Sequence, residues 1–335
     1  MKLSDFDYNL PKELIAQEPP LERGVSRLLV VDRQKNSIEH KIFSDIVDYV
    51  NANDIVILNN TKVLPARLIG KKITGGKVDI LIINQKEDGL YECLIKPTLK
   101  LHDKIIFSEG KLVGECIARN IIRFNADKSV IYEYGVMPLP PYIKRLPKKN
   151  DQVRYQTVFA KKDGAIAAPT AGLHFTDKLL EGLKDKTNLT YVTFHVGQGT
   201  FKPVKDEDIN SHFMHYEEYE VDASVIEDIR AARAKGGRVI CVGTTACRVI
   251  ETIADKVISP SEKAMDLKDK TNLFILPGYN FKLTDCLLTN FHLPKTTLLM
   301  LVSAFMGQEL LKKSYSLAIA NNYRFYSYGD AMLIL

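Results

Sequence analysis

Apolar and polar positions follow two different periods along the chain. Residues 43–50 carry apolar side chains at helical spacing, and 54–59 hold a short apolar run typical of a buried strand. From about Leu68 to Tyr134 the pattern becomes strand-like, with short segments separated by turn formers such as Thr74-Gly75-Gly76. After the prolines of 137–142, helical and strand patterns alternate again. The pattern alone therefore divides the chain into three stretches.

The middle stretch predicts a small antiparallel β-barrel, because short strands joined by tight turns are typical of such barrels. Helices interleaved with strands on either side predict a layered α/β/α sheet domain. We therefore expect an α/β protein in which residues 1–62 and 150–335 form one discontinuous domain and residues 63–149 form a barrel inserted into it. The prolines of 137–142 should be extended, since proline fixes its own φ and restricts the preceding residue.

Local signals give more detailed expectations. Residues 130–134 alternate and predict one more barrel strand. Ser224 and Glu227 have the spacing of a capping box, which would begin a helix that ends near Gly236-Gly237. Two further helices are expected near the C-terminus, at about 297–306 and 308–321.

Composition fits two soluble domains. The chain has 335 residues, of which 45% are hydrophobic and 26% charged, so a large core with a solvated surface is possible. No stretch approaches the roughly 20 apolar residues of a membrane helix, and the N-terminus lacks the pattern of a signal peptide. The five cysteines are odd in number and scattered, as in reduced cytosolic proteins. We expect a cytoplasmic protein without a membrane partner.

Charge is segregated although the net value is only +5. Residues 62–77 and 142–162 are strongly basic, whereas 205–228 are strongly acidic. Basic clusters of this kind favour a polyanion such as RNA, and a solvated face is the alternative for either cluster alone.

Polar segments rich in glycine and threonine follow several predicted strands. They are Asn59-Asn60-Thr61-Lys62, His195 to Thr200, Gly243-Thr244-Thr245 and Thr289-Asn290-Phe291-His292. Ligands collect at the carboxyl ends of strands in open sheets, so four such segments predict a shared pocket. Each segment alone would suit a turn equally well. The small-residue run Ala168-Pro169-Thr170-Ala171-Gly172-Leu173-His174 would leave space beside the His174 imidazole that ends it.

Five side chains are candidates for proton transfer, because imidazoles and partly buried carboxylates can titrate near neutral pH. They are His174, His195, His212, His215 and Asp330. The residues leave other roles open. A core histidine suits the first two, a surface pair or a weak metal site with Glu217 suits the next two, and a turn cap suits Asp330.

Several long segments together identify a resemblance. They are Pro65-Ala66-Arg67-Leu68, Thr74 to Val78, Pro138 to Ile143, Arg154 to Ala160, Ala167 to Thr176, His195 to Val204, Val242 to Thr245, Thr289 to Pro294 and Tyr323 to Met332. The chain resembles the S-adenosylmethionine:tRNA ribosyltransferase-isomerase family of queuosine biosynthesis over its whole length. One departure is Gly24-Val25, where the family commonly has an acid before Ser26-Arg27-Leu28-Leu29.

The resemblance implies a specific reaction. The ribosyl part of S-adenosylmethionine would be transferred to 7-aminomethyl-7-deazaguanine at the tRNA wobble position and isomerised to epoxyqueuosine, with release of adenine and methionine. S-adenosylmethionine would be a consumed substrate, so no cofactor and no metal is expected. The partners would be S-adenosylmethionine and tRNA carrying 7-aminomethyl-7-deazaguanine, and we expect a monomer.

The resemblance also suggests roles for particular residues. The five proton-transfer candidates keep that role. Substrate contacts are expected from Thr170, Gly197, Thr200, Thr244 and Asn290, with Tyr279, Tyr326 and Tyr328 facing adenine or the sulfonium. Contacts to tRNA phosphates are expected from Arg67, Lys144, Arg145, Lys148 and Arg154.

Two other functions stay open at this point. An S-adenosylmethionine-dependent RNA methyltransferase would release S-adenosylhomocysteine, although no Gly-x-Gly-x-Gly motif is present. A non-catalytic tRNA-binding protein would bind in a salt-sensitive way and consume no small molecule.

Overall fold

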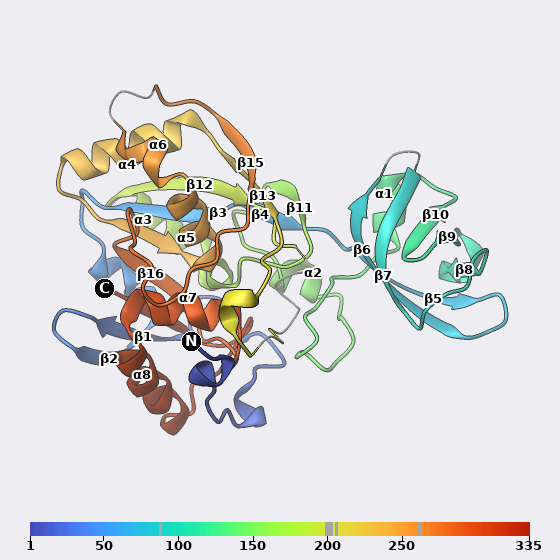
Figure 1. Ribbon diagram of the computed structural model, residues 1–335, viewed down its shortest axis with the longest axis horizontal. Helices are drawn as coiled ribbons and strands as arrows, with labels where there is room; N and C mark the ends of the chain where they lie inside the picture. Colours follow the sequence, from blue (N-terminus) through green and yellow to red (C-terminus); the bar gives the residue numbers. More distant parts are fainter. Residues whose placement is uncertain (87–88, 198–203, 205–206, 260–262) are drawn as a thin grey trace.

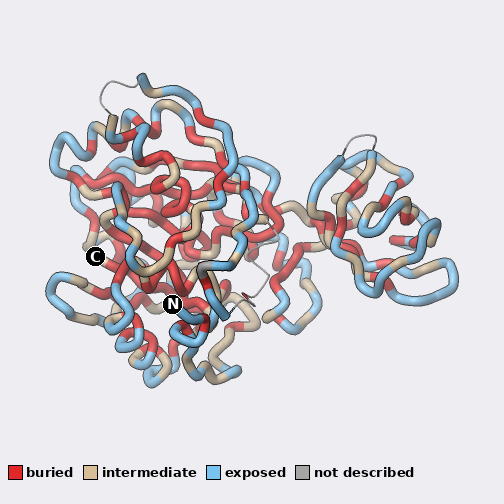
Figure 2. Tube along the Cα trace, in the orientation of Figure 1, coloured by how far each residue is buried: buried red, intermediate tan, exposed pale blue. Residues whose placement is uncertain are grey.

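The computed structural model describes residues 1–86, 89–197, 204, 207–259 and 263–335. Figure 1 shows a large sheet with helices around it and a small barrel set to one side, joined by a narrow connection. Buried residues concentrate along the central strands of the sheet and inside the barrel, as Figure 2 shows. The predicted fold class, a layered sheet domain with an inserted antiparallel barrel, is confirmed. The boundaries at residues 62–63 and 149–150 stay a prediction.

The described residues form a nine-stranded mixed sheet whose strands come from both ends of the chain. Its order is β15 (Leu267–Thr271), β13 (Glu217–Val221), β12 (Asn188–Phe194), β3 (Ile55–Asn59), β14 (Val239–Val242), β16 (Cys286–Asn290), β17 (Ala331–Ile334), β1 (Arg27–Asp32) and β2 (Ser37–Ile42). Strands β12, β3, β14 and β16 run parallel, so their carboxyl ends lie at one edge. The other pairs are antiparallel, except for the parallel pair of β17 and β1.

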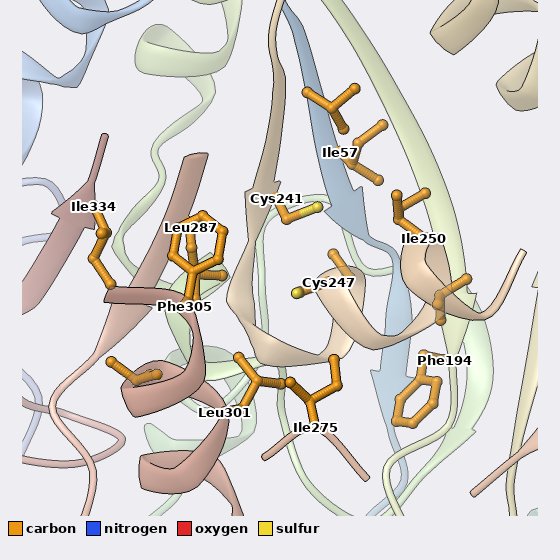
Figure 3. Close-up of a cluster of buried hydrophobic side chains, with 14 of the residues drawn as sticks. Ile57, Phe194, Cys241, Cys247, Ile250, Ile275, Leu287, Leu301, Phe305 and Ile334 are labelled. Atoms are coloured by element: carbon orange, nitrogen blue, oxygen red, sulfur yellow. The ribbon is translucent and has the colours of Figure 1, made fainter. Parts of the chain in front are cut away.

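Helices cover both faces of the sheet because its central strands are apolar on both sides. Ile57 of β3 belongs to one core cluster and Val56 to another, as period-two alternation requires. Figure 3 shows part of the first cluster, in which Ile57, Cys241 and Leu287 of the sheet share a core with helix residues such as Ile250 and Leu301. The helices outside the barrel are α2 (Asp151–Arg154), α3 (Asp177–Lys184), α4 (Ala223–Ala234), α5 (Gly243–Thr252), α6 (Ala254–Ile258), α7 (Thr297–Met306) and α8 (Gln308–Ala320).

The smaller elements complete the sheet domain. A two-stranded parallel ladder joins β4 (Thr61–Val63) to β11 (Lys162–Ala165) where the chain leaves for the barrel and returns. The 3-10 turns are η1 (Leu3–Phe6), η2 (Lys12–Leu14), η3 (Phe43–Tyr49), η6 (Thr170–His174), η8 (Ile209–Ser211) and, in the barrel, η5 (Ser108–Gly110). All five cysteines are free and buried. None of the helices in the described part of the chain has the length and apolar character that crossing a bilayer would require.

The barrel is closed and antiparallel. Its order is β10 (Ile121–Phe124), β7 (Leu90–Lys96), β6 (Lys77–Gln85), β5 (Arg67–Lys72), β8 (Lys104–Phe107) and β9 (Leu112–Ala118). Gly70 must lack a side chain, because a Cβ there would lie 2.6 Å from the Phe107 ring. The expected strand over 130–134 is wrong: Lys128–Glu133 forms helix α1, which buries Ile131 in the barrel core. The alternating pattern over 130–134 did not reflect a strand, because Ile131 is the buried residue that holds this short helix against the barrel core.

The expected capping box is wrong as well. Helix α4 begins at Ala223, with Asp222 rather than Ser224 at the N-cap. The Ala223 N–H donates instead to Asp266 Oδ1 at 2.8 Å, so a residue far along the chain satisfies the helix start. By contrast, α7 spans Thr297–Met306 as predicted, and the Thr296 side chain accepts from the Leu299 N–H.

Candidate active site

A pocket opens at the carboxyl ends of the parallel strands β14 and β16. The space between its lining residues is about 750 Å³, a figure that includes open solvent. The described residues that line it come from several separate segments of the chain: Tyr142, Tyr155, Ala167 to Ala171, Phe194, Val196, Gly243 to Thr245, Arg248, Thr289, Asn290, His292, Leu298, Tyr326 and Ser327. Of the four polar segments expected to share a pocket, those after β14 and β16 line it, Val196 alone lines it from the described part of His195 to Thr200, and Asn59 to Lys62 do not line it.

The small-residue run forms one wall of this pocket. Ala167, Ala168, Pro169 and Ala171 are buried and line it, and Thr170 is half-buried among them. Gly172 lets the run pack tightly, since a Cβ there would lie 2.8 Å from the neighbouring phenylalanine and threonine side chains. The small side chains leave open the volume that larger ones would fill.

The N-terminus of α5 forms a second wall. Gly243 has φ of +87°, a conformation that glycine adopts at little cost, and it begins the helix directly after β14. Thr244, Thr245 and Arg248, at the second, third and sixth positions of this helix, line the pocket. Arg248 is 6% exposed. Its Nη1 donates to Glu217 Oε2 and its Nε to the Leu273 carbonyl at 3.0 Å.

Asn290, at the end of β16, is held in one orientation by its neighbours. Its Nδ2 donates to the Tyr326 carbonyl at 2.9 Å and to His174 Nε2 at 3.2 Å. The His174 ring then carries its proton on Nδ1 and donates to Ser26 Oγ at 3.0 Å. Burial lowers the pKa of His174 to about 4, so the ring is neutral at pH 7. His174 therefore lies behind Asn290 and fixes its amide.

His292 is the histidine that lines the pocket among the described residues. Its Nε2 lies 2.8 Å from Thr289 Oγ1, and its backbone N–H donates to the Tyr315 hydroxyl at 3.1 Å. The ring is 5% exposed, and burial lowers its pKa to about 3. His292 is therefore uncharged at neutral pH.

Two tyrosines meet edge to face at the rim of the pocket. The Tyr142 and Tyr326 rings lie 3.8 Å apart at 75°. Tyr326 has φ of +75°, a costly conformation for a residue with a bulky side chain. The Tyr142 hydroxyl bonds to Ser327 Oγ, which ties the barrel connection to the C-terminal turn. Strain maintained by such contacts commonly marks a functional site.

Three polar atoms of the pocket residues have no hydrogen-bond partner among the described residues. They are Thr245 Oγ1, Arg248 Nη2 and Asn290 Oδ1, all with almost no exposed surface. A buried polar atom without a partner costs about 1–3 kcal/mol, so such atoms are rare in folded proteins. Three of them around one pocket indicate a site whose polar contacts are completed by a ligand.

The predicted substrate-binding residues divide between pocket and surroundings. Thr170, Thr244, Asn290 and Tyr326 line the pocket. Gly197 lies beside it, where its N–H donates to Glu217 Oε1 at 3.0 Å, and Thr200 lies outside the described residues. The remaining two tyrosines bond to carboxylates away from the pocket lining, Tyr279 to Glu251 at 3.3 Å and Tyr328 to Asp151 at 2.9 Å.

The other proton-transfer candidates lie away from the described pocket lining. His195 Nδ1 lies 2.8 Å from Thr61 Oγ1, in a separate hollow beside β13, and burial lowers its pKa. The His212 ring packs edge-on against Phe274, and His215 is exposed. Asp330 accepts from the backbone N–H groups of Arg27 at 2.9 Å and of Arg324 at 2.8 Å, which makes it the anchor of a turn.

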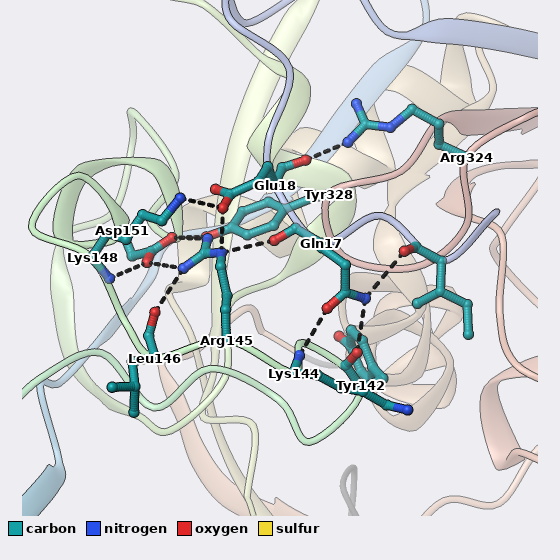
Figure 4. A network of polar contacts seen from close by, with 11 residues as sticks. Gln17, Glu18, Tyr142, Lys144, Arg145, Leu146, Lys148, Asp151, Arg324 and Tyr328 are labelled. Atoms are coloured by element: carbon teal, nitrogen blue, oxygen red, sulfur yellow. Dashed lines mark hydrogen bonds and ion pairs between the residues drawn. The ribbon is translucent and has the colours of Figure 1, made fainter. Parts of the chain in front are cut away.

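The predicted tRNA contacts include both exposed and paired side chains. Lys144 and Lys148 are exposed, and the Lys148 Nζ pairs with Glu18. Figure 4 shows the network in which Arg145 pairs with Asp151 at 2.6 Å and with Glu18 at 2.8 Å. Elsewhere, Arg67 pairs with Asp79 at 2.5 Å and Arg154 Nη1 donates to the Leu21 carbonyl at 2.8 Å. Lys144 is therefore exposed and outside the described ion pairs, whereas Lys148 already pairs with Glu18.

Sequence reasoning missed several pocket residues. Arg248 carried no motif, although its spacing from Thr245 places both on one side of a helix. His292 belonged to a polar segment that was predicted to contribute to the pocket, but was not itself singled out. Tyr142 was assigned only to a linker. Among the described residues, no group of three His, Cys, Asp or Glu side chains is placed to hold a metal ion.

Known proteins resemble this chain along its full length. The S-adenosylmethionine:tRNA ribosyltransferase-isomerases of Halothermothrix orenii and Clostridioides difficile are 48% and 47% identical to it, over alignments that cover 100% of each chain. The solved structure of the S-adenosylmethionine tRNA ribosyltransferase from Thermotoga maritima is 37% identical, with a TM-score of 0.58. That match covers 99% of this chain and 100% of the other. A family model described as queuosine biosynthesis protein matches residues 3–334, and the chain therefore belongs to the queuosine biosynthesis protein family.

Proposed function

We propose that this chain is an S-adenosylmethionine:tRNA ribosyltransferase-isomerase. It transfers the ribosyl group of S-adenosylmethionine to 7-aminomethyl-7-deazaguanine at the wobble position of tRNA and isomerises it to epoxyqueuosine. Adenine and methionine are the other products, so S-adenosylmethionine is a consumed substrate and no cofactor is required. Membership of the family and the names of its full-length relatives support this activity.

The observation that carries the proposal is the pocket with its three unpaired polar atoms. S-adenosylmethionine has a charged amino-acid end, a sulfonium, a ribose and a purine, and it therefore needs donors, acceptors and aromatic surface in one cavity. The pocket offers donors at Arg248, an acceptor at Asn290 and the tyrosine pair at its rim. No described lining residue is acidic, so the aromatic faces would be the main attraction for the sulfonium.

The reaction needs a base in the pocket. A base takes a proton from the carbon beside the sulfonium, and adenine leaves with the electron pair of its glycosidic bond and takes up a proton. The amine of the modified base then forms a bond to the sugar and gives up a proton. Finally, a sugar oxygen closes the epoxide while the carbon–sulfur bond breaks and methionine leaves. Uncharged His292 is positioned to accept the first proton.

His174 has a different part in this proposal. Both of its ring nitrogens are engaged, one with Ser26 and the other with Asn290, so it has no free site for a substrate proton. It acts as a positioning residue that turns Asn290 Oδ1 toward a ligand donor, such as a sugar hydroxyl or the adenine amino group.

The tRNA would approach from the side of the barrel connection. Lys144 and Lys148 are exposed there, and Tyr142 of the same segment reaches the pocket. Phosphate contacts by these lysines would place the anticodon loop next to the tyrosine pair. We further propose that the protein acts as a cytoplasmic monomer.

One assay separates this function from its alternatives. The protein is incubated with S-adenosylmethionine and tRNA carrying 7-aminomethyl-7-deazaguanine, and the small molecules are separated by chromatography. Adenine and methionine in equal amounts are expected. S-adenosylhomocysteine would indicate a methyltransferase instead, and unchanged S-adenosylmethionine despite salt-sensitive tRNA binding would indicate a non-catalytic binding protein.

A further inference from the structure

We propose that Thr245, in the first turn of α5, and Arg248, about one turn further along, bind the carboxylate at the amino-acid end of S-adenosylmethionine. The proposal rests on the proposed function and adds to it the orientation of the substrate. The amino-acid end would lie against α5, and the nucleoside end would lie toward Asn290 on β16.

The Arg248 guanidinium is fixed on every side except one. Its Nε donates to the Leu273 carbonyl at 3.0 Å, its Nη1 pairs with Glu217, and its Cζ lies 5.0 Å above the Phe194 ring. Glu217 is held in turn by the Gly197 N–H at 3.0 Å. These contacts leave Nη2 as the donor without a partner among the described residues.

The chemistry of Nη2 selects its partner. A guanidinium has only donors, so the missing group must be an acceptor, and a ligand in the pocket that Arg248 lines can supply one. Carboxylates pair with arginine through short, charge-assisted hydrogen bonds. S-adenosylmethionine carries one carboxylate and no phosphate, and that group lies at its amino-acid end.

Two further features of α5 favour an anion at the same place. The helix has ten residues and begins with Gly243 and Thr244, whose backbone lines the pocket at the positive end of the helix dipole. Thr245 Oγ1 is a second polar atom without a partner, one position further along. A hydroxyl can donate to a carboxylate oxygen beside the guanidinium.

Asn290, at the end of β16, excludes the reverse orientation. Both protons of Asn290 Nδ2 are committed to the Tyr326 carbonyl and to His174, so the side chain presents only its Oδ1 acceptor. A carboxylate there would face another acceptor, which is repulsive, whereas a hydroxyl or amino group would be bound. The pocket therefore has a donor side and an acceptor side, and these match the two ends of the substrate.

The test compares S-adenosylmethionine with its decarboxylated analogue, which keeps the sulfonium, ribose and adenine. Adenine release is measured at saturating tRNA, and the ratio of kcat/KM for the two compounds is determined. The wild type should favour S-adenosylmethionine by about 10- to 100-fold, as expected for hydrogen bonds to a charged group. Arg248→Gln should lower this ratio to within about threefold of one. Its matched control is Arg33→Gln, an arginine stacked 4.0 Å from Phe305 with its donors bound to backbone carbonyls.

Each outcome has one meaning. Equal use of both compounds by the wild type, or an unchanged preference in Arg248→Gln, would overturn the carboxylate assignment while the proposed function stands. Failure of the wild type to release adenine from S-adenosylmethionine would instead remove the proposed function. If Arg248→Gln does not fold, Arg248→Lys retains a positive charge for Glu217 but lacks Nη2, and the same loss of preference is required of it.

Discussion

Buried polar side-chain atoms all have hydrogen-bond partners in the described barrel strands, whereas some at the pocket edge of the sheet do not. Inside the barrel strands β5 to β10, each buried side-chain nitrogen or oxygen of the described residues has a partner, and surface charges pair locally, as Lys72 does with Asp103 at 2.7 Å. At the pocket edge, three such atoms lack partners. Four further unpartnered atoms lie outside both the barrel strands and the pocket lining, at Arg154, Thr157, Ser303 and Ser314.

The largest effect should come from removing the pocket base. His292→Gln keeps a polar side chain but cannot accept a substrate proton, so kcat for adenine release should fall by about 100- to 10,000-fold. The measurement is steady-state turnover with saturating tRNA and S-adenosylmethionine. His40→Gln on β2 is the control, since His40 bonds to Tyr323 away from the pocket lining. A kcat within threefold of wild type for His292→Gln would contradict the assignment of the base.

A destabilising substitution in the barrel core should not change the stability of the sheet domain. Phe107→Ala removes a buried ring that packs against Gly70 and Phe124, and should destabilise the barrel by about 3–5 kcal/mol. Hydrogen exchange should show lost protection in β5 to β10 and unchanged protection in β3, β14 and β16. Ile69→Ala, an outward-facing change on the neighbouring strand β5, is the control. Equal loss of protection in both domains would mean that they fold as one unit.

Acid should weaken the sheet domain before the barrel. Burial lowers the pKa of His174 to about 4 and of His292 to about 3, below the value near 6.5 of an unfolded chain. Below pH 6.5 the unfolded state binds more protons than the folded state, so stability falls as pH falls. Each histidine should cost about 1.4 kcal/mol per pH unit down to its folded pKa.

Urea denaturation at pH 7 and at pH 5 measures this loss. His174→Gln should show a smaller loss of stability between the two values than wild type, whereas the control His215→Asn, at an exposed position, should show the same loss. An identical pH dependence in wild type and His174→Gln would contradict the view that a neutral imidazole is required in the folded state.

The smallest effect should come from the surface. Lys144→Ala removes one exposed charge beside the barrel connection and should lower the slope of log affinity for tRNA against log salt by about one. The KM for S-adenosylmethionine should not change. Lys235→Ala, at an exposed position after α4, is the control. If both variants have the same salt slope as wild type, tRNA does not contact this segment at Lys144.

Much of the fold was predictable because local pattern and tertiary structure agree. The buried run of β3 and the ends of α7 follow directly from apolar spacing and the Thr296 cap. The pairing of β17 with β1 was not predictable, since it joins the two ends of the chain. No local signal specifies which distant strands become neighbours.

The site was predictable by segment but not by side chain. The polar segments after β14 and β16 do line the pocket. Which histidine faces it depends on how the chain leaves β16 and on what packs behind Asn290, so His174 was singled out while His292 was not. Arg248 was missed because it is singled out by its Nη2, which has no hydrogen-bond partner among the described residues. A sequence pattern does not show which side-chain atoms lack partners.

The pairing of β1 with β17 also bears on how the protein is made. Arg27 and Asp330, which flank these strands and bond to each other, are 303 positions apart. During synthesis, the barrel strands emerge together and can close early, because domains generally fold as units on the ribosome. The apolar strand β1 must wait for β17 before both of its edges are paired. Chaperones that bind exposed strands should therefore meet the nascent chain at Leu28 to Val31, and release it only when translation is almost complete.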